Sequence, residues 1–519
     1  MIARKNFEAW GVISGSLAAG AAYAWFAGED INWDWQNYHE YSAFALLNGR
    51  FSQDVAPAGI QTFLNPLAYL PAYLLRHTIA APFWGMMLGA LHGLNLALIY
   101  WFSRVALGRT AGRWALAASV AIAAFGPMTL SEVGTSFADI LTAMPVIAGV
   151  GFVLLARPEH RRYHIIAGLL IGAAAGLKLT NAVFFIGAAA SLIFAPRPSR
   201  ALSYFALGGA IGALATGGAW DWMLWQQFGN PVFPFYNSIF HSPEAPFEAI
   251  ADLRFMPRTL WEAFAYPFYW VIGDHRSSEG PFRDPRFALL FVLFAANATA
   301  SLIYKIRVFT RRDWQFLLFF AIAYAMWLSA FSIHRYAVAL ELLAAPLIVL
   351  LLSRLVGALR HASPQAHRLA WSNFATVTAA VVIACWSQPA DWLRRPWSDP
   401  YHPLVPQALR APATFLLIEK PVGYVVPMLA SGSRAYQLAD ILLPIVPGGS
   451  LDRRIRSGLA NPLPGGVWAI HLRGSPPRRE LLDGYRLEFD PSRSCEIIRG
   501  ANEVDVEACP LIASKLAAR

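Results

Sequence analysis

FEAWGVISGSLAAGAAYAWFA, residues 7–27, is an apolar run that leads directly into a polar and aromatic stretch, GEDINWDWQNYHEYSAFALLNGR, residues 28–50. About 20 consecutive apolar residues are enough for a helix to cross the hydrocarbon core of a bilayer. The run is long and further apolar runs follow it, so it predicts a retained first span rather than a cleaved signal peptide. Acids, amides and large aromatic side chains are therefore expected where this span leaves the membrane.

The composition of the chain also indicates a membrane protein. Its 519 residues are 56% hydrophobic and 14% charged, whereas soluble domains carry roughly 25% charged residues. The net charge of +10 does not require a nucleic-acid partner, because much of the arginine lies in short loops between apolar runs. The sequence contains neither a Walker-type phosphate loop nor a CxxC metal motif.

The apolar runs predict an α-helical polytopic protein with about eleven spans. These lie at 7–27, 80–103, 114–130, 139–156, 164–177, 180–195, 201–221, 287–304, 314–331, 336–353 and 369–387. Each predicted inner loop carries at least two basic residues, so the positive-inside rule places the amino terminus in the cytoplasm. Loops 28–78 and 222–286 are then on the outer face of the membrane.

The composition changes after residue 387, which divides the chain into a transmembrane module, 1–387, and a small soluble α/β domain, 388–519. Short β-type segments are expected at 413–419, 467–472 and 485–490. A helix is expected at 451–459. An odd number of spans would place this domain in the periplasm.

Two of the three cysteines, Cys495 and Cys509, lie in this domain. An oxidising periplasm would allow a disulfide between them, and the alternative is two unpaired thiols.

Ionisable residues collect at the predicted outer face more than the positive-inside rule requires. A charged side chain near the depth of the bilayer costs at least about 2.5 kcal/mol, so it often marks a function. Lys178 and Arg335 are flanked by apolar residues, and both are suited to bind phosphate, Arg335 through its planar fork and Lys178 as a point charge. The other members of this set include Glu29, Asp30, Asp34, His39, Glu40, Asp54, Glu132, Asp139, Asp274, His334 and Glu341. Together they suggest a cavity that accepts the head group of a phosphorylated lipid.

Residues 34–47 suit a short helix along the membrane surface that stops at Asn48 and Gly49. Asp34, Tyr38 and Tyr41 would share one face of this helix, with the carboxylate beside two phenols. An interfacial aromatic belt explains the aromatic residues equally well. Capping of the helix by Asp34 is an alternative reason for its carboxylate, and one that is compatible with catalysis.

These features resemble the GT-C superfamily of membrane glycosyltransferases, which use polyprenyl-phosphate sugars, and within it protein mannosyltransferases and the aminoarabinose transferase of lipid A. The matching positions are Asp34, Tyr38, Ala43, Leu47, Gly49, Asn65, Pro66, Leu67, Arg335, Tyr336 and Pro346. The chain departs from the pattern at Trp35, where many relatives have a second acid, so Asp30 stays an alternative to Asp34.

The resemblance implies that Asp34 is a general base that deprotonates an acceptor hydroxyl, while Lys178 and Arg335 stabilise the phosphate leaving group. Glu132 and Asp139 are expected to bind the acceptor or a divalent metal, which some relatives use. The neighbouring residues expected to contact substrate are Tyr38, Asn65, His334 and Tyr336.

The predicted function is transfer of a sugar from a polyprenyl-phosphate carrier to a glycan, lipid or protein acceptor at the periplasmic face of the membrane. One alternative is a flippase or transporter for a lipid-linked sugar, although the sequence shows no inverted repeat. The other is an outer-face polymerase or ligase that uses a pyrophosphate-linked glycan.

Overall fold

A computed structural model describes residues 2–108, 111–157, 160–247, 252–359, 368–397, 404–499 and 504–514. It separates into two compact units. The first, called here the helical unit, consists of Met1–Ala27, Gly85–Gly218 and Ala251–Trp392. The second, called the sheet unit, consists of Gly28–Trp84, Ala219–Ile250 and Leu393–Arg519.

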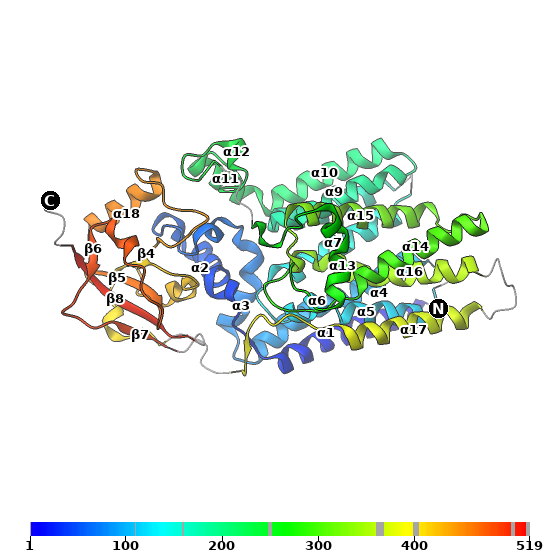
Figure 1. The fold of residues 1–519 in the computed structure, drawn as a ribbon, viewed down its shortest axis with the longest axis horizontal. Helices are drawn as coiled ribbons and strands as arrows, with labels where there is room; N and C mark the ends of the chain where they lie inside the picture. Colours follow the sequence, from blue (N-terminus) through cyan, green and yellow to red (C-terminus); the bar gives the residue numbers. More distant parts are fainter. Residues whose placement is uncertain are drawn as a thin grey trace. The chain divides into compact units, whose positions relative to one another are not determined.

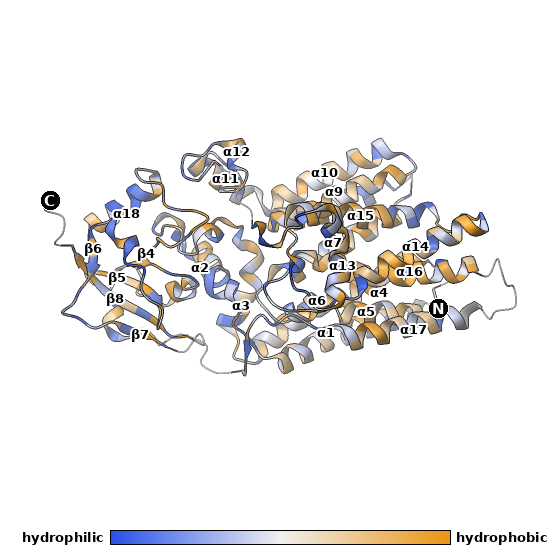
Figure 2. Ribbon diagram, viewed as in Figure 1, coloured by the Kyte–Doolittle hydropathy of each residue, from blue (hydrophilic) through white to orange (hydrophobic). Residues whose placement is uncertain are grey.

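The helical unit is built from long apolar helices (Figures 1 and 2). Its helices are α1 (Ile2–Ala27), α4 (Phe83–Leu107), α5 (Arg113–Ala124), α6 (Pro127–Glu132), α7 (Ala138–Leu155), α8 (Arg161–Leu177), α9 (Ala182–Ser191), α10 (Pro198–Thr216), α13 (Leu260–Val271), α14 (Arg286–Tyr304), α15 (Arg311–Ala330), α16 (Val338–Leu359) and α17 (Arg368–Trp386), with short 3₁₀ turns η5 (Leu179–Asn181), η6 (Leu192–Phe194), η7 (Leu253–Phe255) and η8 (His334–Ala337). Helix α8 packs on α7 and α10, α14 packs on α16, and α5 packs on α16 and α17.

Each predicted span overlaps at least one helix of this unit, although the span predicted at 201–221 extends beyond the end of α10 at Thr216. Among the described residues, five helices are long and apolar enough to cross a membrane, or six if α10 and the helix that follows it form one bent span. The predicted span 114–130 is not continuous, because α5 ends at Ala124 and α6 begins at Pro127. Proline lacks the backbone N–H that would continue the helix. A multi-pass membrane protein is thus confirmed, and the total number of spans stays a prediction.

Helices α8 and α10 approach each other so closely that only glycine fits between them. A Cβ atom on Gly168 would lie 1.9 Å from the carbonyl oxygen of Phe205, and one on Gly172 would lie 2.2 Å from that of Gly209. Between membrane helices, where lipid is as apolar as the side chains, small residues give association through close backbone packing.

The sheet unit contains a mixed sheet of six strands in the order β4-β3-β5-β8-β6, with β7 also paired to β8 (Figure 1). The strands are β3 (Thr414–Leu417), β4 (Arg434–Gln437), β5 (Val467–Leu472), β6 (Leu487–Phe489), β7 (Glu496–Ile498) and β8 (Val506–Ala513). Strand β3 is parallel to both β4 and β5, and β8 is antiparallel to β5, β6 and β7. The expected strands correspond to β3, β5 and β6, and the expected helix to α18 (Ser450–Ala460). A disulfide joins Cys495 to Cys509.

The remaining elements of the sheet unit come from three parts of the chain. They are β1 (Glu29–Asp30), η1 (Trp35–His39), α2 (Glu40–Asn48), η2 (Arg50–Ser52), η3 (Gly59–Phe63), η4 (Pro66–Tyr69), α3 (Leu70–Thr78), α11 (Gly218–Phe228), α12 (Asn237–Phe240), β2 (Arg394–Arg395), η9 (Gln407–Leu409), η10 (Gly423–Met428) and α19 (Glu480–Asp483). The predicted first outer loop is therefore a folded part of the unit that contains the carboxyl-terminal sheet.

A buried ion pair attaches this loop to the sheet. Arg50 and Asp54 form a bidentate pair with contacts of 2.9 and 2.7 Å. The Asp54 Oδ1 atom also accepts a hydrogen bond from the backbone N–H of Ala435 in β4, and Arg50 donates to the carbonyl of Ser433. Val55 then forms a parallel bridge with Tyr436, so the loop extends the sheet at its β4 edge.

Replacing Gly172 with valine is expected to separate α8 from α10. The added side chain meets backbone atoms that cannot rotate away, so the expected cost is about 1–3 kcal/mol or more. The matched control is Gly15→Val in α1, where a Cβ atom meets nothing within 4 Å. Thermal unfolding and size-exclusion profiles in detergent should show loss of stability for G172V but not for G15V. Equal melting temperatures of the two variants would contradict the close contact between α8 and α10.

Candidate active site

The helix that carries Asp34 begins at Trp33 and contains the π-helical turn η1 before it continues as α2. Asn32 caps its amino terminus, because its side-chain oxygen accepts a hydrogen bond from the backbone N–H of Trp35 at 2.7 Å. The expected stop is confirmed, since Gly49 follows α2 in the left-handed conformation. Asn32 thus fills the capping position that was one explanation for the carboxylate of Asp34.

Only one of the two expected phenols lies beside Asp34. The Tyr38 hydroxyl donates to the Asp34 Oδ2 atom at 3.3 Å. The Tyr41 hydroxyl donates to Asp54 instead, at 3.1 Å. A π-helical turn inserts an extra residue, so positions seven apart no longer share a face. The prediction that both phenols flank Asp34 is correct for Tyr38 and wrong for Tyr41.

Asp30, the alternative base, is fully buried in β1. Its Oδ1 atom accepts hydrogen bonds from the backbone N–H and the side-chain amide of Asn32, at 3.1 and 2.6 Å. Its carbonyl accepts from the Arg76 guanidinium at 2.7 Å. The two hydrogen bonds from Asn32 give the Asp30 carboxylate a role in shaping the turn that precedes Asp34.

Asn65, which was expected to contact the substrate, caps a short helix in the structure. Its side-chain oxygen accepts a hydrogen bond from the backbone N–H of Leu67 and so starts η4. This turn carries Tyr69, whose ring stacks on His39 at 4.3 Å and meets Tyr38 edge-on at 5.4 Å. Asn65 therefore helps to place the aromatic residues around Tyr38.

A cation that the sequence interpretation missed lies in the same unit. Lys420 donates from its ammonium group to Gln61 Oε1 at 3.0 Å and to Asp440 Oδ2 at 3.3 Å. The ring of Trp33 lies 5.7 Å from this group. The available signal was the position of Lys420 just after a short strand, because ligand sites in parallel sheets lie at the carboxyl ends of strands.

In the helical unit the structure brings together predicted site residues from three separate loops. Lys178 donates to both carboxylate oxygens of Asp139 at 2.6 Å. Its ammonium group lies 4.6 Å from the centre of the Tyr336 ring. The Arg335 guanidinium lies 5.0 Å from the rings of both Tyr336 and Phe137. Two cations thus lie against the Tyr336 ring, and Asp139 binds one of them, Lys178.

Glu132 joins this group from the end of α6. Its Oε2 atom accepts a hydrogen bond from the backbone N–H of Ile140 at 3.0 Å. Its Oε1 atom is buried and has no hydrogen-bond partner among the described residues. Burial, and secondly the Asp139 carboxylate, raise the pKa of Glu132 well above its usual range, although Lys178 and Arg335 oppose this.

His334 belongs to a second, fully buried group. Its Nε2 atom lies 3.5 Å from Asp284. Arg286 binds Asp284 at 2.7 Å and Glu341 at 3.0 Å. Burial of Asp284 favours its neutral form, but Arg286 and His334 outweigh this effect and keep its pKa below the usual range. His334 was expected to contact the substrate. In the structure its neighbours are the buried acids Asp284 and Glu341.

This buried group fixes the helix that ends at Glu132. Glu341 accepts hydrogen bonds from the backbone N–H groups of Met128 and Thr129, at 3.1 and 2.8 Å, and from the Thr129 hydroxyl at 2.6 Å. A carboxylate at these N–H groups is favourable for a helix start. The acid on α16 thus holds the amino-terminal end of α6.

Within the part of the chain that the structure describes, two groups of side chains have the composition of a metal site, and neither fits one. Asp284, His334 and Glu341 place ligand atoms within 4.8 Å of one another, but the guanidinium of Arg286 already supplies the positive charge between the two acids. The prediction of a divalent metal at Glu132 and Asp139 stays a prediction.

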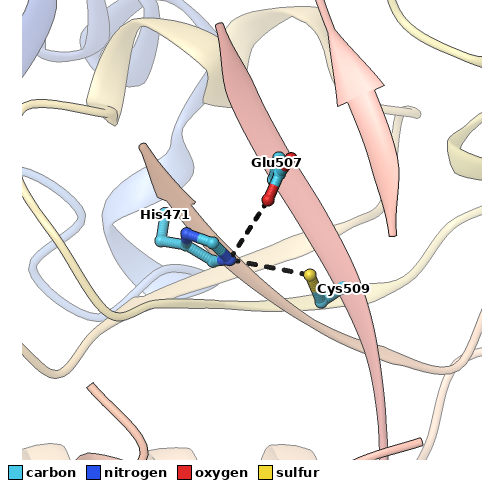
Figure 3. A group of neighbouring side chains, drawn as sticks. All are labelled: His471, Glu507 and Cys509. Atoms are coloured by element: carbon cyan, nitrogen blue, oxygen red, sulfur yellow. Dashed lines mark hydrogen bonds and ion pairs between the residues drawn. The ribbon is translucent and has the colours of Figure 1, made fainter. Parts of the chain in front are cut away.

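The second group is His471, Glu507 and Cys509 on β5 and β8 (Figure 3). The His471 Nε2 atom lies 3.6 Å from the Cys509 sulfur and 3.9 Å from Glu507. The sulfur of Cys509 is bonded to Cys495. A disulfide sulfur carries no thiolate charge, and the thiolate is the form that binds metals.

The chain belongs to glycosyltransferase family 87, whose sequence model matches residues 62–328. Among solved structures, ArnT from Cupriavidus metallidurans, bound to undecaprenyl phosphate, is similar with a TM-score of 0.43 and 11% identity over 98% of both chains. Comparison with curated proteins found no match. The prediction of a membrane glycosyltransferase is confirmed by the family.

Replacing Glu132 with glutamine is expected to change how stability depends on pH. The pKa of Glu132 is raised above 4.5 in the folded protein. Its neutral form therefore favours folding, and this contribution is lost as the pH rises through the raised value. The melting temperature of E132Q relative to wild type should rise as the pH increases above 4.5.

The control is Glu496→Gln at a partly exposed position of the sheet unit, which shows how much of any change comes from replacing a glutamate with glutamine as such. If the melting temperatures of E132Q and wild type change with pH in parallel, Glu132 is not the group whose ionisation opposes folding.

Proposed function

We propose that this family member transfers a sugar from a polyprenyl-phosphate carrier to a hydroxyl group of an acceptor at the periplasmic face of the bacterial inner membrane. In this proposal the amino terminus is cytoplasmic, and residues 388–519 form a periplasmic domain. The observation that carries it is the pair of cations, Lys178 and Arg335, at the Tyr336 ring.

The leaving group of such a donor is a phosphate anion. Negative charge grows on its oxygen as the bond to the anomeric carbon breaks, so cations are needed more than a general acid. Lys178 and Arg335 meet this need, and the Tyr336 and Phe137 rings give them an apolar surface suited to a lipid-linked phosphate. Asp139 holds the Lys178 ammonium at 2.6 Å and so fixes its direction.

The attacking group is the acceptor hydroxyl, whose proton must be removed as it bonds to the anomeric carbon. Asp34 is the proposed base, since the Tyr38 hydroxyl orients its carboxylate and Asn32 fills the cap position. Asp30 is the second candidate, but its carboxylate oxygen holds Asn32. The proton passes to the carboxylate, and the products are the glycosylated acceptor and the carrier phosphate.

Replacement of Asp34 with asparagine is expected to lower turnover by at least about 100-fold, because an amide cannot accept the acceptor proton. Purified protein in lipid is given radiolabelled polyprenyl-phosphate sugars and a crude envelope extract, and loss of label from the carrier is measured. Asp30→Asn is the matched comparison and should retain more turnover. Full activity in D34N with loss in D30N would assign the base to Asp30.

Lipid-pyrophosphate glycans are included as donors, and transbilayer movement is measured in parallel. Turnover of the pyrophosphate donors alone would favour the polymerase or ligase. Transbilayer movement without transfer of label would favour the flippase.

Substitution of Lys178 by methionine or Arg335 by lysine is expected to reduce kcat more than donor binding, since the cations act on charge that grows in the transition state. A decrease of about 10²–10³-fold in kcat is typical when one side chain that stabilises the charge of a transition state is removed. Steady-state kinetics with the donor identified above provide the measurement. An increase in KM alone would show that the two residues only bind the carrier.

A further inference from the structure

Three side chains on one face of the sheet are of the types that bind zinc (Figure 3). His471 on β5 is paired directly with Glu507 on β8. Cys509 lies two positions further along β8, and side chains two apart in a strand point to the same face. The pairing of β5 with β8 therefore places an imidazole, a carboxylate and a sulfur side by side.

Cys495 brings a second sulfur to this group from the neighbouring strand. It directly precedes β7, in which Glu496 is paired with Ala508 of β8, so it faces Cys509 across the two strands. The Cα atoms of the two cysteines are 4.1 Å apart. Strand pairing holds this separation as well as the disulfide does, so the two sulfurs stay neighbours when the bond between them is broken.

The distances from the His471 Nε2 atom match those around a tetrahedral zinc ion. Zinc bonds of about 2.3 Å to sulfur and about 2.0–2.1 Å to nitrogen place two such ligand atoms about 3.6 Å apart. The Cys509 sulfur lies 3.6 Å from Nε2. The Glu507 Oε2 atom lies 3.9 Å from Nε2, where tetrahedral zinc requires about 3.4 Å. A small rotation of the Glu507 side chain, which is 24% exposed, closes this difference.

The other contacts of His471 and Glu507 direct the required atoms toward this group. The His471 Nδ1 atom lies 3.0 Å from the backbone carbonyl of Leu472, which only accepts hydrogen bonds, so Nδ1 carries the proton of the neutral ring and Nε2 keeps its lone pair. Histidines that bind metals usually donate their second ring N–H in this way. Arg473 lies 3.5 Å from the other carboxylate oxygen of Glu507, Oε1, and so orients the carboxylate.

The disulfide prevents the two sulfurs from binding a metal, and its two ends differ in access. Cys495 is exposed, whereas Cys509 is 3% exposed. The thiolate of a dithiol reductant can therefore attack Cys495 Sγ, and the S–S bond breaks with its electron pair on Cys509 Sγ. The second thiol of the reductant then displaces Cys495 and closes a cyclic disulfide, so two electrons pass to the protein. The cysteines take up the protons of the two reductant thiols until a metal replaces them.

We propose that reduction of this disulfide creates a zinc site in the carboxyl-terminal sheet. Its ligands are the thiolates of Cys495 and Cys509, the His471 Nε2 atom and the Glu507 Oε2 atom. The ion then joins β5, β7 and β8, so these strands are crosslinked in the reduced protein as well as in the oxidised protein. The inference is independent of the proposed sugar transfer.

The test uses the full-length protein in detergent with Cys385→Ser, so that the disulfide cysteines supply all the thiols. The protein is reduced with a dithiol, freed of it without oxygen and titrated with Co²⁺, a spectroscopic substitute for zinc. Reduced protein should show a thiolate-to-cobalt charge-transfer band and the visible bands of tetrahedral cobalt, and Zn²⁺ should remove both. Oxidised protein should show neither. Zn²⁺ should also raise the melting temperature of the reduced protein alone.

His471→Ala and Glu507→Gln keep both thiols and each remove one proposed ligand. Each should weaken Zn²⁺ binding at least about 10-fold, because loss of even an outer partner of a metal ligand has this effect. Competition with a chelator of known affinity gives the measurement. Glu496→Gln is the matched control and should bind as wild type does, since Glu496 is next to Cys495 but on the opposite face of the strand.

The inference is overturned if the reduced protein shows no cobalt bands. It is also overturned if H471A and E507Q bind Zn²⁺ as tightly as wild type, because the two cysteines alone would then hold the metal. Glu507 is partly exposed, so E507Q should fold even if H471A does not. The affinity of E507Q relative to E496Q then decides the test.

Discussion

The buried pair of Arg50 and Asp54 is the contact on which the arrangement of the sheet unit depends. It joins the loop that follows the Asp34 helix to β4, where Asp54 accepts a hydrogen bond from Ala435. Removing one partner of such a pair leaves an uncompensated buried charge, at a cost of about 3–5 kcal/mol. With the loop in place, Gly59 packs on Asp440 and Lys420, so the loop and the carboxyl ends of β3 and β4 are held in one folded unit.

In the helical unit a buried group of charged side chains fixes the position of a helix. Arg286 neutralises Asp284 and Glu341 in a fully buried group, and Glu341 uses its remaining hydrogen-bonding capacity to start α6. That helix ends at Glu132, next to the cations at the Tyr336 ring. The buried group therefore fixes the helix that carries Glu132 into electrostatic range of Lys178 and Arg335.

Much of this could be predicted from the sequence, since apolar periodicity determines where membrane helices form and short β-type segments determine β3, β5 and β6. The convergence of Lys178, Asp139 and Arg335 was also predictable, because charged residues in apolar surroundings need partners. Lys420 and the partners of His334 were not, because these contacts join residues far apart in the sequence and leave no local pattern. The false pairing of Tyr41 with Asp34 came from assuming a regular α-helix, whereas the π-helical turn changes which residues share a face.

The link between Asp54 and Ala435 spans 381 positions of the chain. During synthesis the segment that carries Asp34 emerges early, and most of the apolar helices are made before its sheet exists. Contacts of such long range form late, because the entropy of closing the intervening chain must be overcome first. The sheet unit can therefore be completed only after the apolar helices have been synthesised, and a chain interrupted midway would carry Asp54 without the strand that it binds.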